Sequence, residues 1–280
     1  MQLHSRLPLF SAFSLLCAAC GDHEMMSTSS HAVCATEEID AFEAKLVTDG
    51  VVVIPNVFSL DEIASYRGEY DRLFAHLLEQ TKVLPKKSLE YISAFEKKAY
   101  GTKHYWDYEG TQILELAPGR YDFTWGMDQD VFASEHFQNQ EPVRTLMNRL
   151  LAPDFTHMSG ALPSMSSSAN GPWHRDTYPL FSNDDHGYVT TGLPEFYYTI
   201  LIPLVKLTKE NGTTEFIVGS HKKTYQQAVS ENLPHFQADV EPGSVIVFNG
   251  KIYHRGRENK TDVDRPVLYQ VYHKKWYNDY

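Results

Sequence analysis

The spacing of hydrophobic residues divides the chain into a helical first half and a second half of short strands. The first half predicts helices over residues 37–46, 59–80 and 142–151 and a buried strand over 51–54. The second helix begins with a capping box, because Ser59 is followed three residues later by Glu62. Pro142 stands in the first turn of the third helix, where its missing N–H is not needed.

From Phe155 onward, short apolar runs alternate with Gly, Pro and Asn. Such runs are typical of strands joined by turns. They predict eight strands, over 155–160, 163–168, 173–177, 195–205, 214–218, 236–240, 244–249 and 265–272. Strands that follow helices predict an α+β fold, mainly β, whose sheets form a sandwich or jelly roll with flanking N-terminal helices.

Aromatic residues crowd the segment 95–137 among polar residues, without a regular period. They include Tyr100, Tyr105, Trp106, Tyr108, Tyr121, Phe123, Trp125 and Phe132. Two interpretations stay open: these rings line a substrate pocket or lid, or they pack in the core. The same segment contains Arg120, which is either a solvated turn residue or a partner for an acidic group of a substrate or cofactor.

Composition narrows the class of protein. With 42% hydrophobic and 22% charged residues among 280, the chain can bury a core, and we expect one domain over residues 37–280. The net charge of −11 and the lack of a basic cluster argue against nucleic-acid binding. There are 13 His but only three Cys, all before residue 35, so the domain has imidazoles but no thiols for metal or redox chemistry.

Residues 1–36 differ from the rest of the chain and are predicted to be a leader or a disordered N-terminal segment. Arg6 precedes an apolar run over 7–19 that ends before Cys20, as in a secretory or lipoprotein signal. An organelle transit peptide and a start codon further downstream are the alternatives. The run is shorter than the roughly 20 residues that a membrane-spanning helix needs, so we expect no stable membrane span.

His174 and Asp176 are the first candidate metal ligands. On a strand, residues i and i+2 point to the same face, so the imidazole and the carboxylate project side by side. They form two thirds of the facial triad of two His and one carboxylate that holds Fe(II) and leaves other positions open. His254, just after the strong strand pattern of 244–249, is the candidate third ligand. A His-x-Asp pair alone occurs by chance, so the hypothesis depends on all three residues.

Arg265 follows His254 by eleven residues and opens the next predicted strand. The polar segment 256–264 between them predicts a hairpin, which would put His254 and Arg265 on neighbouring antiparallel strands. An arginine there can bind a carboxylate through two parallel hydrogen bonds, which suits the distal carboxylate of 2-oxoglutarate. The alternative for Arg265 is a surface charge at the end of a loop.

Several motifs in the body of the chain occur in a fixed order. They are the segments 49–55 and 58–63, then Trp173-His174-Arg175-Asp176, then 211–216 with Gly219-Ser220-His221-Lys222, and finally 241–248 with His254, Asn259 and Arg265. In this order the chain resembles the phytanoyl-CoA dioxygenase family of Fe(II)/2-oxoglutarate oxygenases, over residues 38–272. One difference is Val218, where the family usually has a proline; it affects a turn rather than the metal.

The resemblance implies a double-stranded β-helix core of the jelly-roll or cupin type. It also implies iron bound by His174, Asp176 and His254, which would be the catalytic centre. The distal carboxylate of 2-oxoglutarate would be anchored by Arg265.

Three further polar residues lie near these motifs. Asn170 precedes the first metal motif and Thr199 lies on a predicted strand, so we expect both as polar neighbours of 2-oxoglutarate. His221 lies in a predicted loop that enters a helix. The resemblance implies a structural role for this histidine, so we exclude it from the site.

We therefore expect a dioxygenase that uses Fe(II), 2-oxoglutarate and O2 to oxidise, most simply by hydroxylation, an unactivated C–H bond of a small molecule such as a natural product, with succinate and CO2 as co-products. Two alternatives stay open: a cupin-like non-haem metal protein that does not use 2-oxoglutarate, and an exported ligand-binding lipoprotein with a degenerate site. Fe(II) and 2-oxoglutarate are supplied inside cells, so we expect a cytoplasmic protein, with export or organelle targeting through residues 1–20 as the alternative. The substrate and the oligomeric state stay open.

Overall fold

The computed structural model describes residues 36–89, 103–177, 180 and 188–277. All of them belong to one of the two compact units of the chain, Ala32–Tyr280. The predicted leader up to residue 35, with its three cysteines, lies outside the described residues. None of the described helices has both the length and the apolarity needed to span a membrane.

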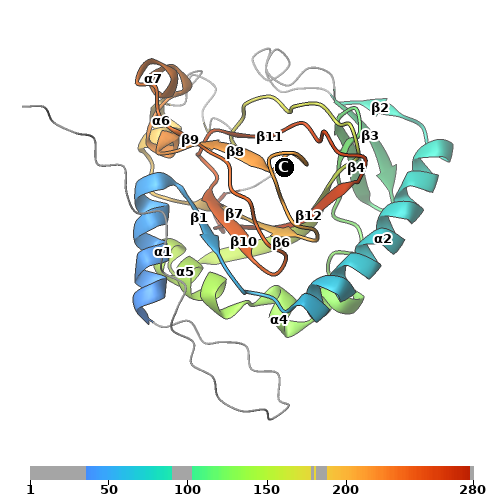
Figure 1. Cartoon of the computed structure of the whole chain (residues 1–280), viewed down its shortest axis with the longest axis horizontal. Helices are drawn as coiled ribbons and strands as arrows, with labels where there is room; N and C mark the ends of the chain where they lie inside the picture. Colours follow the sequence, from blue (N-terminus) through green and yellow to red (C-terminus); the bar gives the residue numbers. More distant parts are fainter. Residues whose placement is uncertain (1–35, 90–102, 178–179, 181–187, 278–280) are drawn as a thin grey trace, which may run out of the picture. The chain divides into compact units, whose positions relative to one another are not determined.

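Two antiparallel β-sheets form the body of the protein (Figure 1). The larger sheet has nine strands in the order β1-β10-β7-β12-β6-β5-β4-β3-β2, and the smaller has three in the order β11-β8-β9. The larger sheet contains β1 (Val51–Ile54), β2 (Lys87–Ser88), β3 (His104–Tyr108), β4 (Thr111–Ala117), β5 (Arg120–Asp122), β6 (Phe155–Ser164), β7 (Tyr197–Pro203), β10 (Val245–Asn249) and β12 (Arg265–Lys274). The smaller contains β8 (Thr214–Ile217), β9 (His235–Phe236) and β11 (His254–Gly256).

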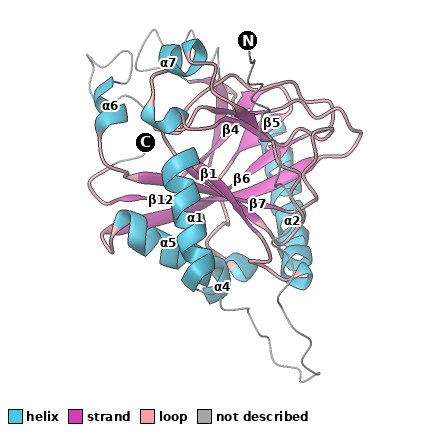
Figure 2. Cartoon of the chain, turned by 60° about the vertical axis from the view of Figure 1, so that its left-hand side comes forward, coloured by secondary structure: helices cyan, strands magenta, loops and turns pink. Residues whose placement is uncertain are grey.

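Helices cover the outer face of the larger sheet (Figure 2). The described helices are α1 (Thr36–Asp49), α2 (Leu60–Val83), α4 (Glu135–Gln138), α5 (Glu141–Leu151), α6 (Tyr188–Gly192) and α7 (Tyr225–Ser230), with short 3-10 turns η1 (Asp130–Ala133) and η2 (Ser220–Lys222). The three helices that the hydrophobic spacing predicts are confirmed as α1, α2 and α5. Their apolar faces join the even-numbered residues of β7 and β12 in one core.

Successive side chains along each strand point to opposite faces of the larger sheet, so one face packs in this core and the other, the inner face, lines a cavity. On β7, Tyr198 and Ile200 pack toward the helices, whereas Thr199 and Leu201 line a cavity on the other side. The same alternation on β12 turns Leu268 to the helices and Arg265 to the cavity. Polar side chains such as Thr199 and Arg265 therefore lie on the inner face of the larger sheet, where they can contact a ligand in the cavity.

The prediction that the first half is helical is wrong for Lys87–Ser88 and for residues 104–122, which contain β2 to β5. These strands make an antiparallel meander that extends the larger sheet beyond β6. The alternation of apolar and polar residues that predicts strands is not visible here, because aromatic residues lie on both faces of the meander. Trp106 and Phe132 are buried in the core, while Tyr121 and Phe123 also line the cavity, so each interpretation of the aromatic segment holds in part.

Several strand boundaries also differ from the prediction. The run 155–160 and the start of the run 163–168 form one continuous strand, β6, which passes through Pro163 opposite Pro266 of β12 and ends at Ser164. The run 173–177 contributes only a bridge between His174 and His254. The run 236–240 is split into β9 and a bridge from Val240 to Leu207.

The predicted hairpin between His254 and Arg265 is wrong. His254 begins β11, which pairs with β8 in the smaller sheet. Arg265 begins β12, which lies between β6 and β7 in the larger sheet. Residues 257–264 thus cross from one sheet to the other, so His254 and Arg265 reach the same cavity from opposite walls.

Replacing Ser59 with alanine is expected to lower the free energy of unfolding by about 1 kcal/mol. The Ser59 hydroxyl accepts a hydrogen bond from the Glu62 backbone N–H at 3.2 Å, and the Glu62 carboxylate accepts one from the Ser59 N–H at 2.8 Å. The substitution leaves an N–H of the first turn of α2 without its cap. Urea denaturation measures the loss, and Ser59→Thr should restore most of it. An unchanged midpoint in Ser59→Ala would show that the cap does not stabilise the fold.

Candidate metal centre

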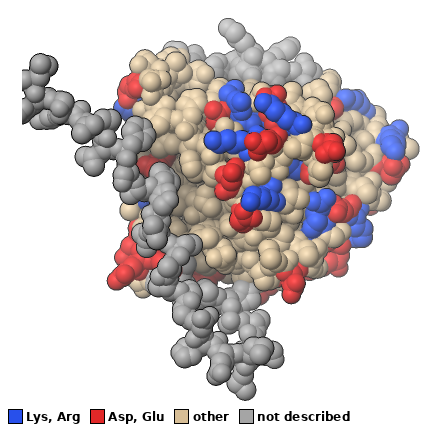
Figure 3. Space-filling view, viewed as in Figure 1, with Lys and Arg blue, Asp and Glu red and all other residues tan. Residues whose placement is uncertain are grey.

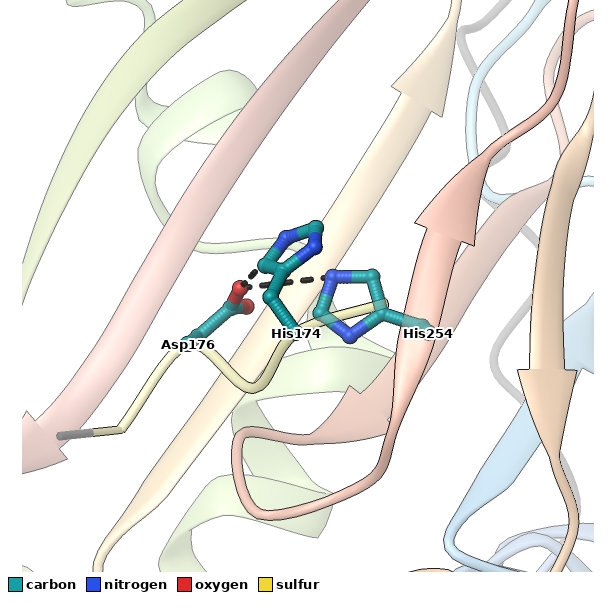
Figure 4. Close-up of side chains that lie close together, drawn as sticks. All are labelled: His174, Asp176 and His254. Atoms are coloured by element: carbon teal, nitrogen blue, oxygen red, sulfur yellow. Dashed lines mark ion pairs between the residues drawn. The ribbon is translucent and has the colours of Figure 1, made fainter. Parts of the chain in front are cut away.

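The structure brings His174, Asp176 and His254 together (Figure 4). The Asp176 Oδ1 lies 3.8 Å from His174 Nε2 and 3.3 Å from His254 Nε2. The three ligand atoms all lie within 4.8 Å of one another. Ligands bound at right angles to one ion at its usual bond lengths are about 3 Å apart, so this donor set fits a single metal ion with only small movements.

Backbone hydrogen bonds hold the ligand-bearing segments against each other. His174 and His254 exchange two backbone hydrogen bonds of 2.9 and 3.0 Å, and the Asp176 N–H donates to the Gly250 carbonyl at 3.0 Å. Arg175 points away from the two ligands beside it and donates to the Thr191 hydroxyl at 3.0 Å. The residues on either side of Arg175 therefore share a face, as the i, i+2 spacing predicts.

Both histidines present the same nitrogen to the metal position. The Nδ1 of His174 lies 3.0 Å from the Pro172 carbonyl, and the Nδ1 of His254 lies 3.1 Å from the Ile252 carbonyl. Since a carbonyl only accepts, each Nδ1 carries the proton and each Nε2 keeps its lone pair. Such partners fix ring orientation and tautomer in metal sites.

The charge states at neutral pH also suit metal binding. Desolvation at the cavity wall, with a smaller contribution from His254, lowers the pKa of His174 to about 4, so this imidazole is neutral. Burial alone would raise the pKa of Asp176, but His254, His174 and the Thr199 hydroxyl hold it below its usual value. A neutral imidazole and a carboxylate are the forms that bind a divalent metal ion.

Thr199 contacts the metal carboxylate. Its hydroxyl donates to Asp176 Oδ2 at 2.5 Å, while Oδ1 faces the two histidines. Thr199 lies on β7 and lines the cavity, and its contact is with a candidate ligand of the metal. The hydrogen bond points one carboxylate oxygen toward the metal position and reserves the other for Thr199.

Asn170 lies in the loop after β6, and its side chain forms a hydrogen bond to the backbone of another segment. The Asn170 Oδ1 accepts a hydrogen bond from the Glu258 backbone N–H at 3.0 Å. The cavity wall includes the next residue, Gly171, but not Asn170. Asn170 therefore ties the loop before His174 to the segment that crosses between the sheets.

Replacing Thr199 with valine is expected to lower the affinity for a divalent metal ion by 10- to 100-fold, about the usual effect of removing a residue that orients a ligand. Valine keeps the branched shape but has no hydroxyl for Asp176. Calorimetric titration with Mn(II) or Ni(II) measures the change, and Thr199→Ser, which keeps the hydroxyl, should bind like the native protein. If the valine and serine variants bind metal equally well, the hydroxyl does not orient Asp176.

Two arginines lie at another part of the same cavity. Arg120, Ser164 and Arg265 are aligned in register across β5, β6 and β12. Arg265 is only 5% exposed and donates to the Ser164 hydroxyl at 2.9 Å, while its Nε has no partner among the described residues. Arg120 is also buried and donates to the Ala169 carbonyl at 2.8 Å, to the Ser164 hydroxyl at 2.9 Å and to the Arg257 carbonyl.

The two guanidinium groups lack an acidic partner. Within the described part of the chain, neither Arg120 nor Arg265 forms an ion pair with a carboxylate. Burial lowers the pKa of Arg265 to about 9, with a contribution from the like charge of Arg120, and burial lowers the pKa of Arg120 to about 10. Buried like charges are costly unless an anion neutralises them, so this end of the cavity fits an anionic group. Arg120 is therefore not the solvated turn residue of the first interpretation.

A cavity of about 570 Å³ connects these features. Its lining includes His174, Asp176 and His254, the two arginines, and apolar side chains of β4, β6 and β12. This volume is typical of a small-molecule site. The apolar wall combines Leu114 of β4 with Met158 and Leu162 of β6, and the sequence does not indicate it because it depends on how these strands are arranged in the sheet.

His221 lies away from the three ligands. Its buried ring packs against Gly50, and its Nε2 lies 3.3 Å from the Val47 carbonyl. A Cβ at Gly50 would come within 2.5 Å of the His221 ring, so glycine is required there. The placement agrees with the structural role that the resemblance implies.

Charged residues do not form a basic patch on the face seen in Figure 3, where acidic and basic side chains are intermixed. On the smaller sheet, Glu215 pairs with Arg255 at 2.8 Å and with Arg257 at 3.0 Å. This face therefore lacks the cluster of positive charge that binds the phosphate backbone of nucleic acids.

Solved structures with a similar fold support the jelly-roll prediction. The non-heme alpha ketoglutarate dependent epimerase SnoN from nogalamycin biosynthesis matches with a TM-score of 0.58 and 18% identity, over 86% of this chain and 84% of that one. HygX from Streptomyces hygroscopicus, solved with nickel, 2-oxoglutarate and hygromycin B bound, matches with a TM-score of 0.58 and 17% identity, over 88% of this chain and 90% of that one. Both likenesses confirm the predicted fold class.

Curated relatives are similar over shorter stretches. The Fe(II)/2-oxoglutarate-dependent dioxygenase nvfF of Aspergillus novofumigatus is 39% identical over 69 residues, which is 25% of this chain and 23% of that protein. The dioxygenase af480 of Aspergillus fumigatus is 39% identical over 74 residues, again 23% of its length. The dioxygenase olcK of Penicillium canescens is 23% identical over 253 residues, or 86% of this chain and 72% of that protein.

The family comparison covers most of the domain. The sequence model of the phytanoyl-CoA dioxygenase family matches residues 46–267, which include both sheets' central strands, all three candidate metal ligands and Arg265. The match therefore extends well beyond half of the 280 residues. The chain belongs to the phytanoyl-CoA dioxygenase family.

Proposed function

We propose that this protein is an Fe(II)- and 2-oxoglutarate-dependent dioxygenase that oxidises a C–H bond of a small molecule, with succinate and CO2 as co-products. One observation carries the proposal: a single cavity contains a two-His, one-carboxylate cluster and, elsewhere on its wall, two buried guanidinium groups without a carboxylate partner. 2-Oxoglutarate has a keto-acid end that suits a metal and a distal carboxylate that suits an arginine. The name of the relative nvfF, an Fe(II)/2-oxoglutarate-dependent dioxygenase, agrees with this assignment.

The protein's part in the reaction is to bind and orient. His174, Asp176 and His254 would hold Fe(II) on one face, and the bound metal supplies the activation of O2. Arg265 would hold the distal carboxylate of 2-oxoglutarate, so that its keto-acid end faces the metal position. The Thr199 hydroxyl keeps Asp176 oriented with one oxygen toward the metal position.

The rest of the cavity favours a largely apolar, uncharged substrate. Met158 is 39% exposed on the inner face of β6, beside Leu162 and across from Leu114 of the meander. Tyr269 and Asp122, joined by a hydrogen bond of 3.0 Å, add a polar contact on the same wall. We infer a natural product with a broad apolar surface and few polar groups, since apolar side chains exposed in a cavity are stabilised by contact with an apolar ligand.

Hydroxylation is the outcome we propose for the oxidised carbon. A neighbour in fold, SnoN, is an epimerase, so the fold is compatible with other outcomes. Mass spectrometry of the product distinguishes the possibilities: hydroxylation adds one oxygen atom, desaturation removes two hydrogens, and epimerisation leaves the mass unchanged.

The two rival functions differ in their demands on the site. If the protein is a cupin-like metal protein that does not use 2-oxoglutarate, no anion is available to neutralise the buried guanidinium groups of Arg120 and Arg265. A ligand-binding lipoprotein with a degenerate site is at odds with three intact ligands whose tautomers and orientation are fixed by hydrogen bonds. Both observations favour the dioxygenase.

We also propose that the enzyme acts in the cytoplasm, where Fe(II) and 2-oxoglutarate are supplied. Fractionation of cells that express the full chain with a C-terminal tag tests this. Recovery of the tagged protein in the soluble cytosolic fraction at its full mass is expected. Recovery of a lipid-modified or shortened form outside the cytosol would favour export instead.

The activity is tested with purified protein loaded anaerobically with Fe(II) and 2-oxoglutarate and then exposed to O2 together with a panel of uncharged, largely apolar natural products. We expect succinate to form in step with an oxidised product. The His254→Ala variant, which lacks one ligand, should form none. If the native protein forms no more succinate than this variant although it binds metal, the proposed function is wrong.

A further inference from the structure

Met158 lies on the wall of the cavity that contains the candidate metal ligands. It lines this cavity from the inner face of β6. The preceding residue, His157, points to the other face of the sheet, where its ring stacks on Tyr272 of the core. The thioether of Met158 is therefore next to the space that a small molecule would fill.

The register of three strands places Met158 near the candidate metal ligands. β12 lies between β7 and β6 (Figure 1), and Val271 of β12 is aligned with Thr199 on one side and with Met158 on the other. Two strand spacings, about 10 Å, thus separate the backbones of Thr199 and Met158. All three side chains line the cavity, and the Thr199 hydroxyl donates to Asp176 at 2.5 Å. Met158 is therefore one residue removed, across the sheet, from a residue that contacts a candidate ligand, whereas Arg265 begins β12 at the other end of the cavity.

Met158 differs from the other methionines of the described residues. It is 39% exposed, whereas Met127 and Met147 are only 2% and 0% exposed. Met165 follows the end of β6 and is partly exposed, but it does not line the cavity. Among the described residues, Met158 is therefore the single methionine on the cavity wall.

A thioether is the most easily oxygenated group on this wall. Its sulfur accepts an oxygen atom through a lone pair, so no bond of the side chain has to break. Hydroxylation of the aliphatic and aromatic neighbours has to break a C–H bond. The product, methionine sulfoxide, is polar, whereas methionine is apolar.

We propose that Met158 is a self-oxidation site: when no substrate fills the cavity, O2 activated at the metal centre oxygenates the Met158 sulfur. This inference rests on the proposed function, which supplies the oxidant. Methionine, 2-oxoglutarate and O2 give methionine sulfoxide, succinate and CO2. The O–O bond and the bond between C1 and C2 of 2-oxoglutarate break, one oxygen atom enters succinate and the other forms the S–O bond. Oxidative decarboxylation supplies two of the four electrons that reduce O2, and the sulfur supplies the other two.

The modification would act on substrate binding. A sulfoxide at Met158 makes the apolar wall polar, so a largely apolar substrate that covers it would have to desolvate the new S–O group. A bound substrate shields Met158 and receives the oxygen atom itself. Turnover without substrate therefore lowers the enzyme's affinity for its substrate, and a methionine sulfoxide reductase would reverse the change.

The main test is peptide mass mapping of the native protein after incubation with Fe(II), 2-oxoglutarate and O2, with catalase present and no substrate added. Met158 and Met165 lie in one tryptic peptide, residues 150–175, whose fragment ions separate them, so Met165 is an internal control for oxidation from solution. We expect Met158 to gain one oxygen atom at least about tenfold more often than Met165, and methionine sulfoxide reductase to remove it. His254→Ala, which lacks a ligand, should show no such preference, and Met158→Leu should remove the site.

A second measurement tests the position of Met158 without turnover. In protein labelled with 13C at the methionine methyl groups, bound Mn(II) broadens the NMR signals of nearby nuclei. We expect Mn(II) to broaden the Met158 signal, identified by its loss in Met158→Leu, far more than that of Met147, which packs in the core on the helix side of the sheet. Equal broadening of the two signals would show that Met158 does not approach the metal position and would overturn the inference.

The failure of this inference is distinguishable from that of the proposed function. If the protein forms succinate but oxygen appears on another cavity residue, or equally on Met158 and Met165, Met158 is not the site and only this inference fails. If the Fe(II)-loaded protein binds 2-oxoglutarate but Met158 gains no oxygen after exposure to O2, this inference again fails alone. If the Fe(II)-loaded protein does not bind 2-oxoglutarate, the proposed function fails and the self-oxidation site with it.

Discussion

Replacing His174 with alanine is expected to lower the affinity for Fe(II) more than about 100-fold and to abolish 2-oxoglutarate turnover. The substitution removes one of three ligands, and the remaining pair, Asp176 and His254, offers only two donor atoms to the ion. Loss of a residue that merely orients a ligand costs 10- to 100-fold, so loss of the ligand itself should exceed that range. His174 is partly exposed, so the fold should survive its truncation.

The control for this prediction is His221→Ala. His221 is buried against Gly50 and does not belong to the cluster of ligands, so its loss should reduce stability but leave metal stoichiometry unchanged. Metal content after dialysis and calorimetric titration of the folded protein give both numbers. Native-like metal affinity in His174→Ala would contradict the assignment of the site, whatever its effect on turnover.

Replacing Arg265 with methionine is expected to weaken 2-oxoglutarate binding by about 100-fold and to leave metal affinity unchanged. A charge-assisted fork to a carboxylate is worth roughly 3 kcal/mol once it is desolvated, and each 1.4 kcal/mol is a factor of ten. Arg265→Lys should recover little, because an ammonium is a single point charge that does not reproduce the planar fork or the contact with Ser164. Titration of the Ni(II)-loaded variants with 2-oxoglutarate measures the loss.

The Arg265→Met variant also distinguishes two roles for Arg265, binding an anion or stabilising the fold. In the absence of ligand, Arg265 and Arg120 are buried like charges with no carboxylate partner in the described residues. Methionine removes one of these charges, so the ligand-free variant should unfold at the same temperature as the native protein or higher. A strong loss of thermal stability with unchanged 2-oxoglutarate binding would show that Arg265 stabilises the fold and does not anchor the distal carboxylate.

The closeness of His174 and Asp176 could be predicted from the sequence because it depends on a local rule, whereas the approach of His254 depends on long-range pairing. On a strand, the i, i+2 spacing of His174 and Asp176 places both side chains on one face, and the structure keeps them side by side although the segment forms only one bridge. The capping box at Ser59 and the spacing within α2 are local for the same reason. Long-range pairing is different: a strand pattern does not specify its partner, so the predicted hairpin put Arg265 beside β11 instead of between β6 and β7.

The residues around the candidate metal ligands, namely Thr199, Ser164 and Arg120, could not be placed from the sequence. Thr199 was expected near 2-oxoglutarate, but its hydroxyl lies on Asp176, and this depends on the register of β7 against its neighbours. Ser164 carried no sequence signal, because its importance comes from the alignment of β5, β6 and β12. The sequence around Arg120 is that of a turn, and its burial results from the pairing of β5 within the meander.

The most direct test of the central claim is an anaerobic absorption measurement on the native protein with Fe(II), with 2-oxoglutarate, and with both. When a 2-oxo acid chelates Fe(II) held by a facial triad, we expect a visible charge-transfer band that neither component gives alone and that His174→Ala does not give. The band should saturate at one 2-oxoglutarate per protein. A native protein that binds Fe(II) but shows no new band at saturating 2-oxoglutarate would contradict the account.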